Sequence, residues 1–207
     1  MTVDYSQQGE QAVIMDILSG ITEGYGADVG ASDGVTINNS KALEEKGWKV
    51  LCIEPNPLYY EALTDNRNLV IPTACSDYSG NFVPFTVITG PFGGLDAGSS
   101  LSPKWNLLHM VGLAGGIKAK RIFPVSVRTL DWCLDWAGFK RLDFLSIDTE
   151  GNEMNVLKGF NIGLWAPKLV VVENWLDGQE FRDYFERAGY VRKHRLHFND
   201  FYLRQDA

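Results

Sequence analysis

Carboxylate side chains stand at or just after the ends of five segments that are expected to form β-strands. The expected strands cover residues 25–29, 48–53, 68–75, 142–147 and 169–172. The acids at their ends are Asp28, Asp33, Glu54, Asp77, Asp148, Glu150 and Glu173. In an open α/β sheet, ligands bind outside the carboxyl ends of the strands. An acidic edge of this kind attracts a cationic ligand and repels a diphosphate.

The turn after the first expected strand argues against a dinucleotide. A pyrophosphate site has the pattern Gly-x-Gly-x-x-Gly, in which the middle glycine lets the backbone approach the phosphates. Here only Gly30 and Gly34 are present. The flanking acids, Asp28 and Asp33, would instead attract the ammonium and sulfonium groups of S-adenosylmethionine. Glu54 is placed to accept hydrogen bonds from both hydroxyls of an adenosyl ribose.

If a ligand of this kind donates its methyl group to a hydroxyl, the reaction needs a base, because the proton must leave as the new bond forms. Asp148, at the end of a central strand, is the first catalytic candidate. Glu150 and Glu153 lie three residues apart at the start of the next expected helix and can face one cleft. Acids at that place can also simply stabilise the helix N-terminus. Glu173, after the neighbouring strand, is a further catalytic candidate.

Two histidines and one tryptophan are further candidates for contacts with the acceptor. His197 lies at the tip of an expected hairpin, where a histidine can be catalytic or only solvated. His109 lies in an expected lid and reaches an acceptor only if that segment folds down. Trp175 can stack on a sugar face or fill the core. The expected substrate contacts are therefore His109, Glu153, Asn174 and Trp175.

Oxygen ligands at two strand ends also permit a magnesium site. Asp148, Glu173 and Asn174 could hold Mg²⁺, which would bind both hydroxyls of a vicinal diol and lower their pKa. Ligands from strand ends have no diagnostic spacing, so the sequence leaves metal dependence open. The three cysteines form no CxxC pair, and zinc is not expected.

These side chains must be positioned by an alternating α/β chain. Apolar residues at helical spacing predict helices around residues 13–21, 41–46, 58–67, 129–137, 154–160 and 180–188. Residues 82–88 predict an antiparallel addition, residues 125–127 a short strand, and residues 190–195 with 201–204 a closing hairpin. The alternation predicts a doubly wound, mostly parallel sheet with helices on both faces and an antiparallel C-terminal edge hairpin.

One long segment interrupts the alternation. Residues 89–120 contain seven glycines and few β-branched residues, so we expect a loop with a short helix near residues 105–111. Loops of this length in compact domains are often lids. No linker or repeat divides the 207 residues. We therefore expect a single domain over residues 1–207 with a lid or insert at about 89–120.

Composition argues against several classes of partner. The chain is 45% hydrophobic and 22% charged, which is typical of a globular protein. Its 19 basic and 26 acidic residues give a net charge of −7, which disfavours a nucleic-acid partner. No apolar run approaches the roughly 18 residues of a membrane span. The N-terminus lacks a signal-peptide pattern, and the odd number of cysteines fits a reducing compartment, so we expect a cytoplasmic protein.

Two blocks of sequence resemble a known family. The first comprises residues 6–10, 28–34, 38–40, 47–48 and 53–57, and the second comprises residues 147–153 and 156–159. Together they resemble the FkbM family of S-adenosylmethionine-dependent methyltransferases over nearly the whole chain. The resemblance implies the class I methyltransferase fold, a Rossmann-like seven-stranded sheet whose last strand is antiparallel. It also implies O-methylation, commonly of sugar hydroxyls in glycans, lipids or secondary metabolites.

The resemblance also implies residues that bind the cofactor. The motif carries the methionine side to Asp28, Gly30, Asp33 and Gly34, the ribose to Glu54, and the adenine to Ser76 and Asp77. Further positions in or near the motifs are Gln8, Ser32, Asn39, Ser40, Pro55, Asn56, Ser100 and Asp148. Ser100 is included because family members often have a Ser-rich segment near the cofactor or acceptor there.

Several functions remain open at this point. The leading one is transfer of a methyl group from S-adenosylmethionine to a hydroxyl of a sugar in a glycan or glycoconjugate. The acceptor could instead be a non-sugar hydroxyl of a secondary metabolite, or the chain could be a non-catalytic adenosyl-binding module. An NAD-linked oxidoreductase is disfavoured by the absent middle glycine. The sequence identifies neither the small-molecule or glycan acceptor nor the oligomeric state.

Overall fold

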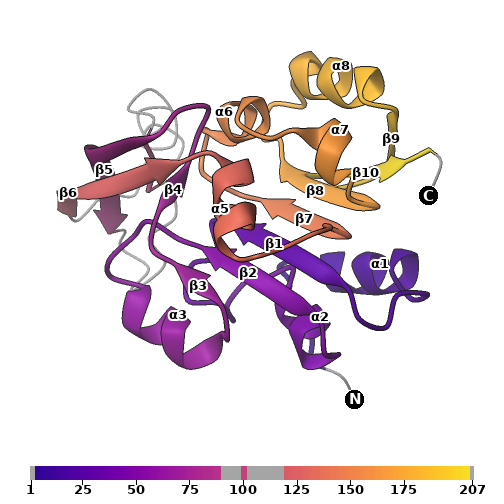
Figure 1. Cartoon of the computed structure of the whole chain (residues 1–207), viewed down its shortest axis with the longest axis horizontal. Coiled ribbons are helices and arrows are strands. Elements are labelled where there is room, and N and C mark those ends of the chain that lie inside the picture. The colour runs from indigo at the N-terminus through magenta and orange to yellow at the C-terminus, as the bar shows by residue number, and fades with distance from the viewer. Residues whose placement is uncertain (1–2, 90–98, 102–118, 206–207) are drawn as a thin grey trace.

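The main sheet of the molecule has seven strands (Figure 1). The computed structural model describes residues 3–89, 99–101 and 119–205. Along the sheet the strands are β3 (Val70–Ile71), β2 (Lys49–Ile53), β1 (Tyr25–Val29), β7 (Phe144–Ile147), β8 (Leu169–Glu173), β10 (Asn199–Arg204) and β9 (Tyr190–Leu196). β10 runs antiparallel to both of its neighbours, β8 and β9, and the other strand pairs of this sheet are parallel. The predicted fold class, with its C-terminal edge hairpin, is confirmed.

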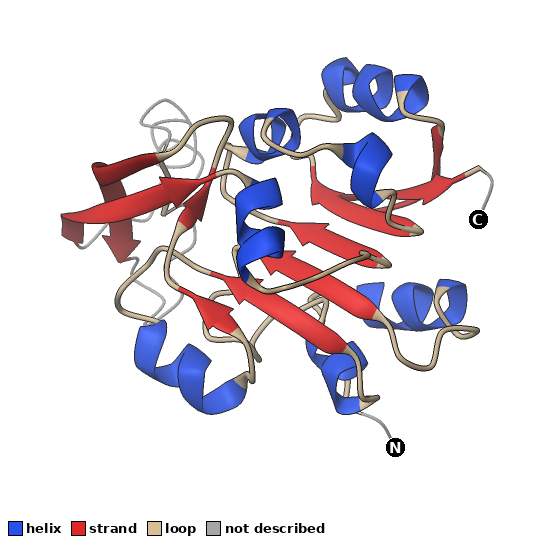
Figure 2. Cartoon of the chain, viewed as in Figure 1, coloured by secondary structure: helices blue, strands red, loops and turns tan. Residues whose placement is uncertain are grey.

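Helices cover both faces of this sheet (Figure 2). One apolar core packs α5 (Leu130–Trp136), α6 (Glu153–Lys158), α7 (Ile162–Trp165) and α8 (Gln179–Arg187) against one face. A second core packs α1 (Glu10–Ile17), α2 (Lys41–Glu45) and α3 (Tyr60–Asn66) against the other. Successive residues 169–172 of β8 alternate between the two cores and are fully buried. A continuous apolar run is therefore what a central strand of this sheet requires.

A second, three-stranded sheet lies beyond the carboxyl ends of β1 and β2 (Figure 1). Its strands are, in order, β4 (Ala74–Cys75), β6 (Ala119–Arg128) and β5 (Gly80–Thr89). β5 pairs antiparallel with β6, and β4 pairs parallel with β6. The second sheet has its own small core, to which Phe85, Val87 and Val127 belong.

The second sheet corrects two sequence-based expectations. Residues 68–75 do not form one strand, because β3 belongs to the main sheet and β4 to the second sheet. Pro72 lies between them and has no backbone N–H for a continuous ladder. Residues 82–88 do form an antiparallel strand, but it pairs with β6 and not with the main sheet. The short strand expected at residues 125–127 is the end of the ten-residue β6.

The insert expected at about 89–120 lies between β5 and β6. Within it the structure describes residues 99–101, where Ser100 forms an antiparallel bridge with Thr86 of β5. The helix expected near residues 105–111 lies outside the described residues. Helix α7 was not expected from the sequence. Among the described residues, no helix combines the length and the apolar character needed to cross a membrane.

The register of the main sheet aligns the ends of its central strands. Val29 of β1 pairs with Ile53 of β2 and with Ile147 of β7. Ile147 in turn pairs with Val172 of β8. The residues that directly follow this aligned row are Gly30, Glu54, Asp148 and Glu173. Four residues that are distant in sequence therefore lie side by side along the carboxyl edge of the sheet.

Candidate active site

A first cavity opens at the carboxyl ends of β1, β2 and β7. Its walls come from the turn after β1, the loop after β2, the start of the second sheet and the loop after β7. The predicted cofactor residues on these walls are Gly30, Ser32, Glu54, Pro55, Asn56 and Asp148. Ser99 and Leu101, which flank the predicted Ser100, complete one side. The cavity thus brings together six of the predicted positions.

Gly30 allows the ends of β1 and β7 to meet. Its φ is 90°, and a Cβ at this position would lie 1.7 Å from the carbonyl oxygen of Asp148. The N–H of Gly30 donates to the carbonyl of Ile53 at 2.9 Å, and the N–H of Asp148 donates to the carbonyl of Val29 at 2.9 Å. Any side chain at position 30 would therefore push apart two strand ends that form the cavity wall.

Glu54 is held on the cavity wall by two loops. Its Oε2 accepts the N–H of Ser32 at 2.9 Å, and its Oε1 accepts the N–H of Asn56 at 2.7 Å. The residue is buried, with 8% of its surface exposed. Hydrogen bonds to an ionised carboxylate are stronger than neutral ones. The loops after β1 and β2 thus fix an acidic group at the position for which the sequence predicts a ribose contact.

Asp28 is buried under the turn and is not among the residues that line this cavity. Its Oδ2 accepts hydrogen bonds from Ser40 Oγ at 2.5 Å and from Asn38 Nδ2 at 2.9 Å. Burial raises the pKa of Asp28, while Arg67 and the two hydrogen bonds act in the opposite direction. Asp28 and Ser40 therefore hold the loop after β1 in place, and the structure shows them as supports of the cavity.

Asp33, Gly34 and Asn39 also lie off the cavity wall. Asp33 closes the turn locally, because its Oδ1 accepts the N–H groups of residues 35 and 36 at 2.9 and 2.7 Å. A Cβ on Gly34 would lie 2.6 Å from Cγ of Arg67, so this glycine permits close packing. Asn39 donates through Nδ2 to Ser146 Oγ at 3.4 Å. These three positions shape the loop that carries Ser32.

The predicted adenine contacts lie just past the residues that reach the cavity. Ala74 and Cys75 line it, whereas Ser76 and Asp77 do not. Ser76 is buried, and its N–H donates to the carbonyl of Arg128 at 3.0 Å. Asp77 is exposed and accepts a hydrogen bond from Ser76 Oγ at 3.2 Å. The wall here is formed by β4, a strand that the sequence did not separate from β3.

Two other predicted cofactor positions lie near the site without lining the cavity. Ser100 is buried and exchanges backbone hydrogen bonds with Thr86 at 3.0 and 3.1 Å. Gln8 is exposed, and its N–H donates to Oε2 of Glu10 at 2.6 Å. Glu10 Oε1 accepts from Asn199 Nδ2 at 3.0 Å, which ties the N-terminal segment to the start of β10.

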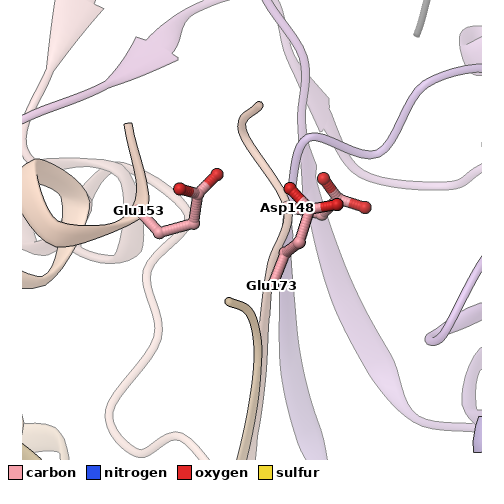
Figure 3. A group of neighbouring side chains, drawn as sticks. All are labelled: Asp148, Glu153 and Glu173. Carbon is pink, nitrogen blue, oxygen red and sulfur yellow. The ribbon is translucent and has the colours of Figure 1, made fainter. Parts of the chain in front are cut away.

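Three carboxylates meet at the ends of β7 and β8. One oxygen from each of Asp148, Glu153 and Glu173 lies within 4.8 Å of the other two. Figure 3 shows Asp148 and Glu173 side by side, with Glu153 facing them from α6. We call these three residues the acid cluster. The first two meet because β7 and β8 are neighbours, and the third arrives because α6 begins directly after the loop that follows β7.

Hydrogen bonds anchor two members of the acid cluster. Glu153 Oε1 accepts the N–H groups of Thr149 and Gly151, each at 2.9 Å, and the hydroxyl of Thr149 at 3.0 Å. Glu173 Oε1 accepts Nε1–H of Trp175 at 2.7 Å. Glu173 Oε2 exposes less than 1 Å² and has no hydrogen-bond partner among the described residues. Such a buried oxygen is costly unless a ligand or a proton satisfies it.

Burial raises the pKa of every carboxyl group in the acid cluster. The pKa of Asp148 is raised well above its usual range, first by burial and then by the neighbouring charges of Glu150 and Glu153. Burial and the charge of Asp148 act in the same way on the pKa of Glu173. For Glu153 the pKa is also raised by burial, against hydrogen bonds that lower it. The cluster therefore attracts protons or cations more strongly than exposed carboxylates do.

Asn174, which the sequence grouped with Asp148 and Glu173, is engaged elsewhere. Its Oδ1 accepts the N–H of Gly178 at 2.8 Å, and its Nδ2 donates to Asp200 Oδ2 at 2.8 Å. Both ends of its amide thus tie the loop after β8 to β10. Glu153, expected as a candidate base or substrate contact but not as a metal ligand, occupies the third position of the acid cluster instead. The spacing of residues along the chain does not indicate that Glu153, and not Asn174, joins Asp148 and Glu173.

A second cavity lies on the other side of the acid cluster. Its walls are Gly151, Glu153, Met154, Glu173, Asn174, Trp175, Leu176, Glu180 and Phe181. Trp175 stacks on Phe198, with ring centroids 3.7 Å apart, and 37% of its surface remains exposed. His197 lies in the same β9–β10 turn, and its ring centroid is 6.3 Å from that of Phe198. Glu150 lines the first cavity, and His109 lies outside the described residues.

Several residues of the first cavity were not expected from the sequence. They are Thr36, Ile37, Tyr59, Thr73, Phe85, Thr149 and Asn152. Phe85 reaches the cavity through the second sheet, whose pairing is long-range and has no local signal. Ile37 has a φ of 51° and is 45% exposed. The sequence shows an isoleucine within a polar segment, and this feature could have drawn attention to the loop.

The fold and the two cavities together define a class I methyltransferase. The seven-stranded sheet has β10 antiparallel between β8 and β9, and an acidic cavity lies at the carboxyl ends of its central strands. A family model described as "Methyltransferase FkbM domain" matches residues 28–192. Because this match spans most of the chain, the protein belongs to the FkbM methyltransferase family. Its methyl donor is S-adenosylmethionine.

Two solved structures are similar to the chain at low identity. A precorrin-6y C5,15-methyltransferase from Geobacter metallireducens GS-15 has a TM-score of 0.46 and 13% identity, over 93% of this chain and 85% of that chain. A TehB-like SAM-dependent methyltransferase from Corynebacterium glutamicum ATCC 13032 Kitasato has a TM-score of 0.43 and 10% identity, over 95% and 88%. No curated protein matches the sequence significantly. Neither solved structure bears on the acceptor of this protein.

The chemistry of the first cavity suits S-adenosylmethionine. Glu54 presents a buried carboxylate where the sequence predicts a ribose contact, and Ile53 with Phe85 contributes apolar surface. Among the described residues on its walls there is no lysine or arginine that would hold a phosphate. Asp148 and Glu150 add negative charge, which favours a ligand that carries ammonium and sulfonium groups.

Proposed function

We propose that the protein transfers the methyl group of S-adenosylmethionine to a hydroxyl oxygen of a sugar, in a glycan or glycoconjugate. The acid cluster carries this proposal, because it connects the two cavities. Asp148 lines the first cavity, and Glu153 and Glu173 line the second. A hydroxyl that enters the second cavity would meet these carboxylates directly beside the cofactor cavity. Carboxylates are suited to bind hydroxyls and to take their protons.

Methyl transfer to oxygen requires alignment and removal of a proton. When bound, S-adenosylmethionine supplies an electrophilic methyl group on a sulfonium. The acid cluster would orient the acceptor hydroxyl toward the first cavity, where the bound cofactor would supply the methyl group and leave as S-adenosylhomocysteine. Asp148 and Glu150 both line that cavity, and one of their carboxylates takes the hydroxyl proton. Such a base contributes roughly 100- to 10,000-fold, and alignment up to about 7–11 kcal/mol.

The composition of the second cavity supports a sugar as the acceptor. Sugar rings present apolar faces and hydroxyl edges, so they need an aromatic surface next to hydrogen-bond acceptors. Trp175 supplies a ring that is braced from one side by Phe198. Glu153, Glu173 and Glu180 supply carboxylates on the same cavity wall.

The test is product analysis with S-adenosylmethionine that carries an isotope-labelled methyl group. The protein is incubated with a panel of sugars, matched non-sugar alcohols and amines, and the products are examined by mass spectrometry and NMR. We expect a labelled methyl ether on a sugar oxygen. Methylation of a non-sugar alcohol, a nitrogen or a carbon would overturn the sugar assignment, as would no product with any sugar from folded protein that binds S-adenosylhomocysteine.

A tryptophan variant tests the acceptor cavity separately. Trp175→Ala should raise the KM for the acceptor by about two- to twelvefold and leave the KM for S-adenosylmethionine within twofold, because a stacked aromatic contact is worth roughly 0.5–1.5 kcal/mol. Trp175→Phe keeps an aromatic ring and should show a smaller effect. The matched control is Trp136→Ala on α5, which is 52% exposed and lies outside both cavities. Equal acceptor KM values in all variants would contradict the assignment.

A further inference from the structure

Within the described part of the chain, the acid cluster holds three carboxylates together without a basic ion-pair partner. Its oxygens lie within 4.8 Å of one another. In the described part of the chain, no lysine, arginine or histidine forms an ion pair with Asp148, Glu153 or Glu173. The nearby bases of the hairpin are engaged elsewhere, since Arg192 and Arg195 pair with Asp200. Ion pairs among residues 3–89, 99–101 and 119–205 therefore leave the negative charge of the cluster unbalanced.

The second observation is the buried, unpartnered oxygen of Glu173. Oε2 is shielded from solvent and accepts no hydrogen bond among the described residues, while Oε1 is fixed by Trp175. Glu153 is fixed in the same manner, because the loop after β7 supplies three donors to its Oε1. Outer donors that hold one oxygen and leave the other for a ligand are typical of metal-binding carboxylates. These hydrogen bonds thus hold the cluster around a place where the described residues supply no ion-pairing base.

We propose that Asp148, Glu153 and Glu173 bind one divalent cation of the Mg²⁺ or Mn²⁺ type between the two cavities. Both ions prefer oxygen ligands, and Mg²⁺ takes six of them in octahedral geometry. Three protein ligands leave positions for water or for acceptor hydroxyls that enter from the second cavity. Glu150 lines the first cavity and is not a member of the cluster, and in the proposed function it takes the hydroxyl proton.

The ligand set differs from the one that the sequence analysis considered, which was Asp148, Glu173 and Asn174. Glu153 replaces Asn174, whose amide is occupied by Gly178 and Asp200. A third carboxylate in place of an amide adds negative charge and should strengthen binding of a dication. The catalytic role of the cation rests on the proposed function, but binding of the cation does not.

Binding is tested with Mn²⁺ alone, by electron paramagnetic resonance of the free ion on protein first dialysed against EDTA. We expect one Mn²⁺ per chain, displaced by excess Mg²⁺. Glu173→Gln and Glu153→Gln should each weaken binding at least tenfold. Asp135→Asn, an exposed acid on α5, is the matched control and should bind as the wild type does. No stoichiometric Mn²⁺, or binding unchanged by both cluster variants, would overturn the proposal.

Melting temperatures show whether a variant that fails to bind Mn²⁺ is still folded. Glu173→Gln removes a negative charge from the cluster, so the cation-free variant should melt no lower than the cation-free wild type. Added Mg²⁺ should raise the melting temperature of the wild type and of Asp135→Asn, but not that of Glu173→Gln. An equal rise in all three proteins would show that Mg²⁺ acts elsewhere on the protein.

Failure of this proposal is distinguishable from failure of the proposed function. If methyl ethers form at the full rate after exhaustive EDTA treatment, the cation has no role in catalysis and the proposed function stands. If Mn²⁺ binds as expected but no hydroxyl is methylated, the cation site stands and the proposed function fails. Binding of S-adenosylhomocysteine, followed by calorimetry without metal, confirms in both cases that the cofactor cavity is intact.

Discussion

Gly30→Ala tests whether the close approach of β1 and β7 is a fixed part of the site. The Cβ that this substitution adds would lie 1.7 Å from the carbonyl oxygen of Asp148, whereas real Cβ contacts essentially never fall below 3.0 Å. The two atoms must therefore separate by at least 1.3 Å, the difference between these distances. That movement strains the hydrogen bonds at 2.9 Å that tie Gly30 to Ile53 and Asp148 to Val29.

The molecule contains a matched control for the backbone conformation. Gly47 has a φ of 89°, against 90° for Gly30, but a Cβ on Gly47 would meet nothing within 4 Å. Gly47→Ala thus reports only the cost of a left-handed alanine, about 1–2 kcal/mol. Gly30→Ala has the same cost plus overpacking and a strained buried hydrogen bond, about 1–3 kcal/mol more. We expect total losses of about 1–2 kcal/mol for Gly47→Ala and about 2–5 kcal/mol for Gly30→Ala.

Urea unfolding measures the free energy of unfolding of both variants, and calorimetric titration measures their affinity for S-adenosylhomocysteine. Gly30→Ala should also weaken binding of S-adenosylhomocysteine by roughly tenfold or more, because Gly30 and Asp148 line the same cavity. Gly47→Ala should leave the affinity within twofold. If the two variants lose the same stability and bind equally well, the contact between Gly30 and Asp148 is not a constraint and the reasoning is refuted.

Three further variants test the supports of the cofactor cavity. Glu54→Gln should weaken binding of S-adenosylhomocysteine at least tenfold by calorimetry, because a charge-assisted hydrogen bond is worth about 1.5–3 kcal/mol. The control is Glu61→Gln, an exposed residue on α3, which should not change the affinity. Equal affinities in the two variants would contradict the ribose assignment. Arg67→Met should lower the free energy of unfolding by about 3–5 kcal/mol, since it removes the positive charge beside the buried Asp28 and leaves Glu44 with the longer ion pair to Lys41 at 3.5 Å. A loss below about 1 kcal/mol in urea unfolding would contradict this account. Burial raises the pKa of Asp28, so the native state binds this proton more tightly than the unfolded chain, and its contribution to stability falls as pH rises from about 3.9 through the raised native pKa. Asp28→Asn should therefore reduce the fall in the free energy of unfolding over that range, and an unchanged pH profile would argue against this account.

The main sheet was predictable because its central strands are buried on both faces. Residues 169–172 form a continuous apolar run that only a covered parallel strand explains. The second sheet was not predictable in the same way. β4 has two residues, and its partner β6 follows only after the segment 90–118, so no local pattern marks the pairing. Long-range pairing of short strands depends on tertiary contacts and not on the composition of the strand itself.

The cavity residues that follow strand ends were predictable from the positions of the strands. Which of the neighbouring residues face the cavity depends on the direction of each side chain. Ala27 and Val29 belong to the core on one face of the sheet, so Asp28 between them must face the other side, where α2 packs. There it meets Asn38 and Ser40 under the loop. Gly30 and Glu54 lie beyond the paired positions and are free of this alternation. The alternating direction of side chains along β1 therefore distinguishes Asp28, which supports the loop, from the residues that line the cavity.

The acid cluster follows from the register of the sheet and carries an electrostatic cost. Two charges 4.8 Å apart repel by about 3.5 kcal/mol at an effective dielectric constant of about 20, so three such pairs cost about 10 kcal/mol. This is comparable to the whole stability of a typical domain, about 5–15 kcal/mol. With no basic ion-pair partner among the described residues, three ionised carboxylates would therefore oppose folding strongly. A proton or a cation bound there relieves this repulsion, and the choice between them decides how the acceptor hydroxyl is held.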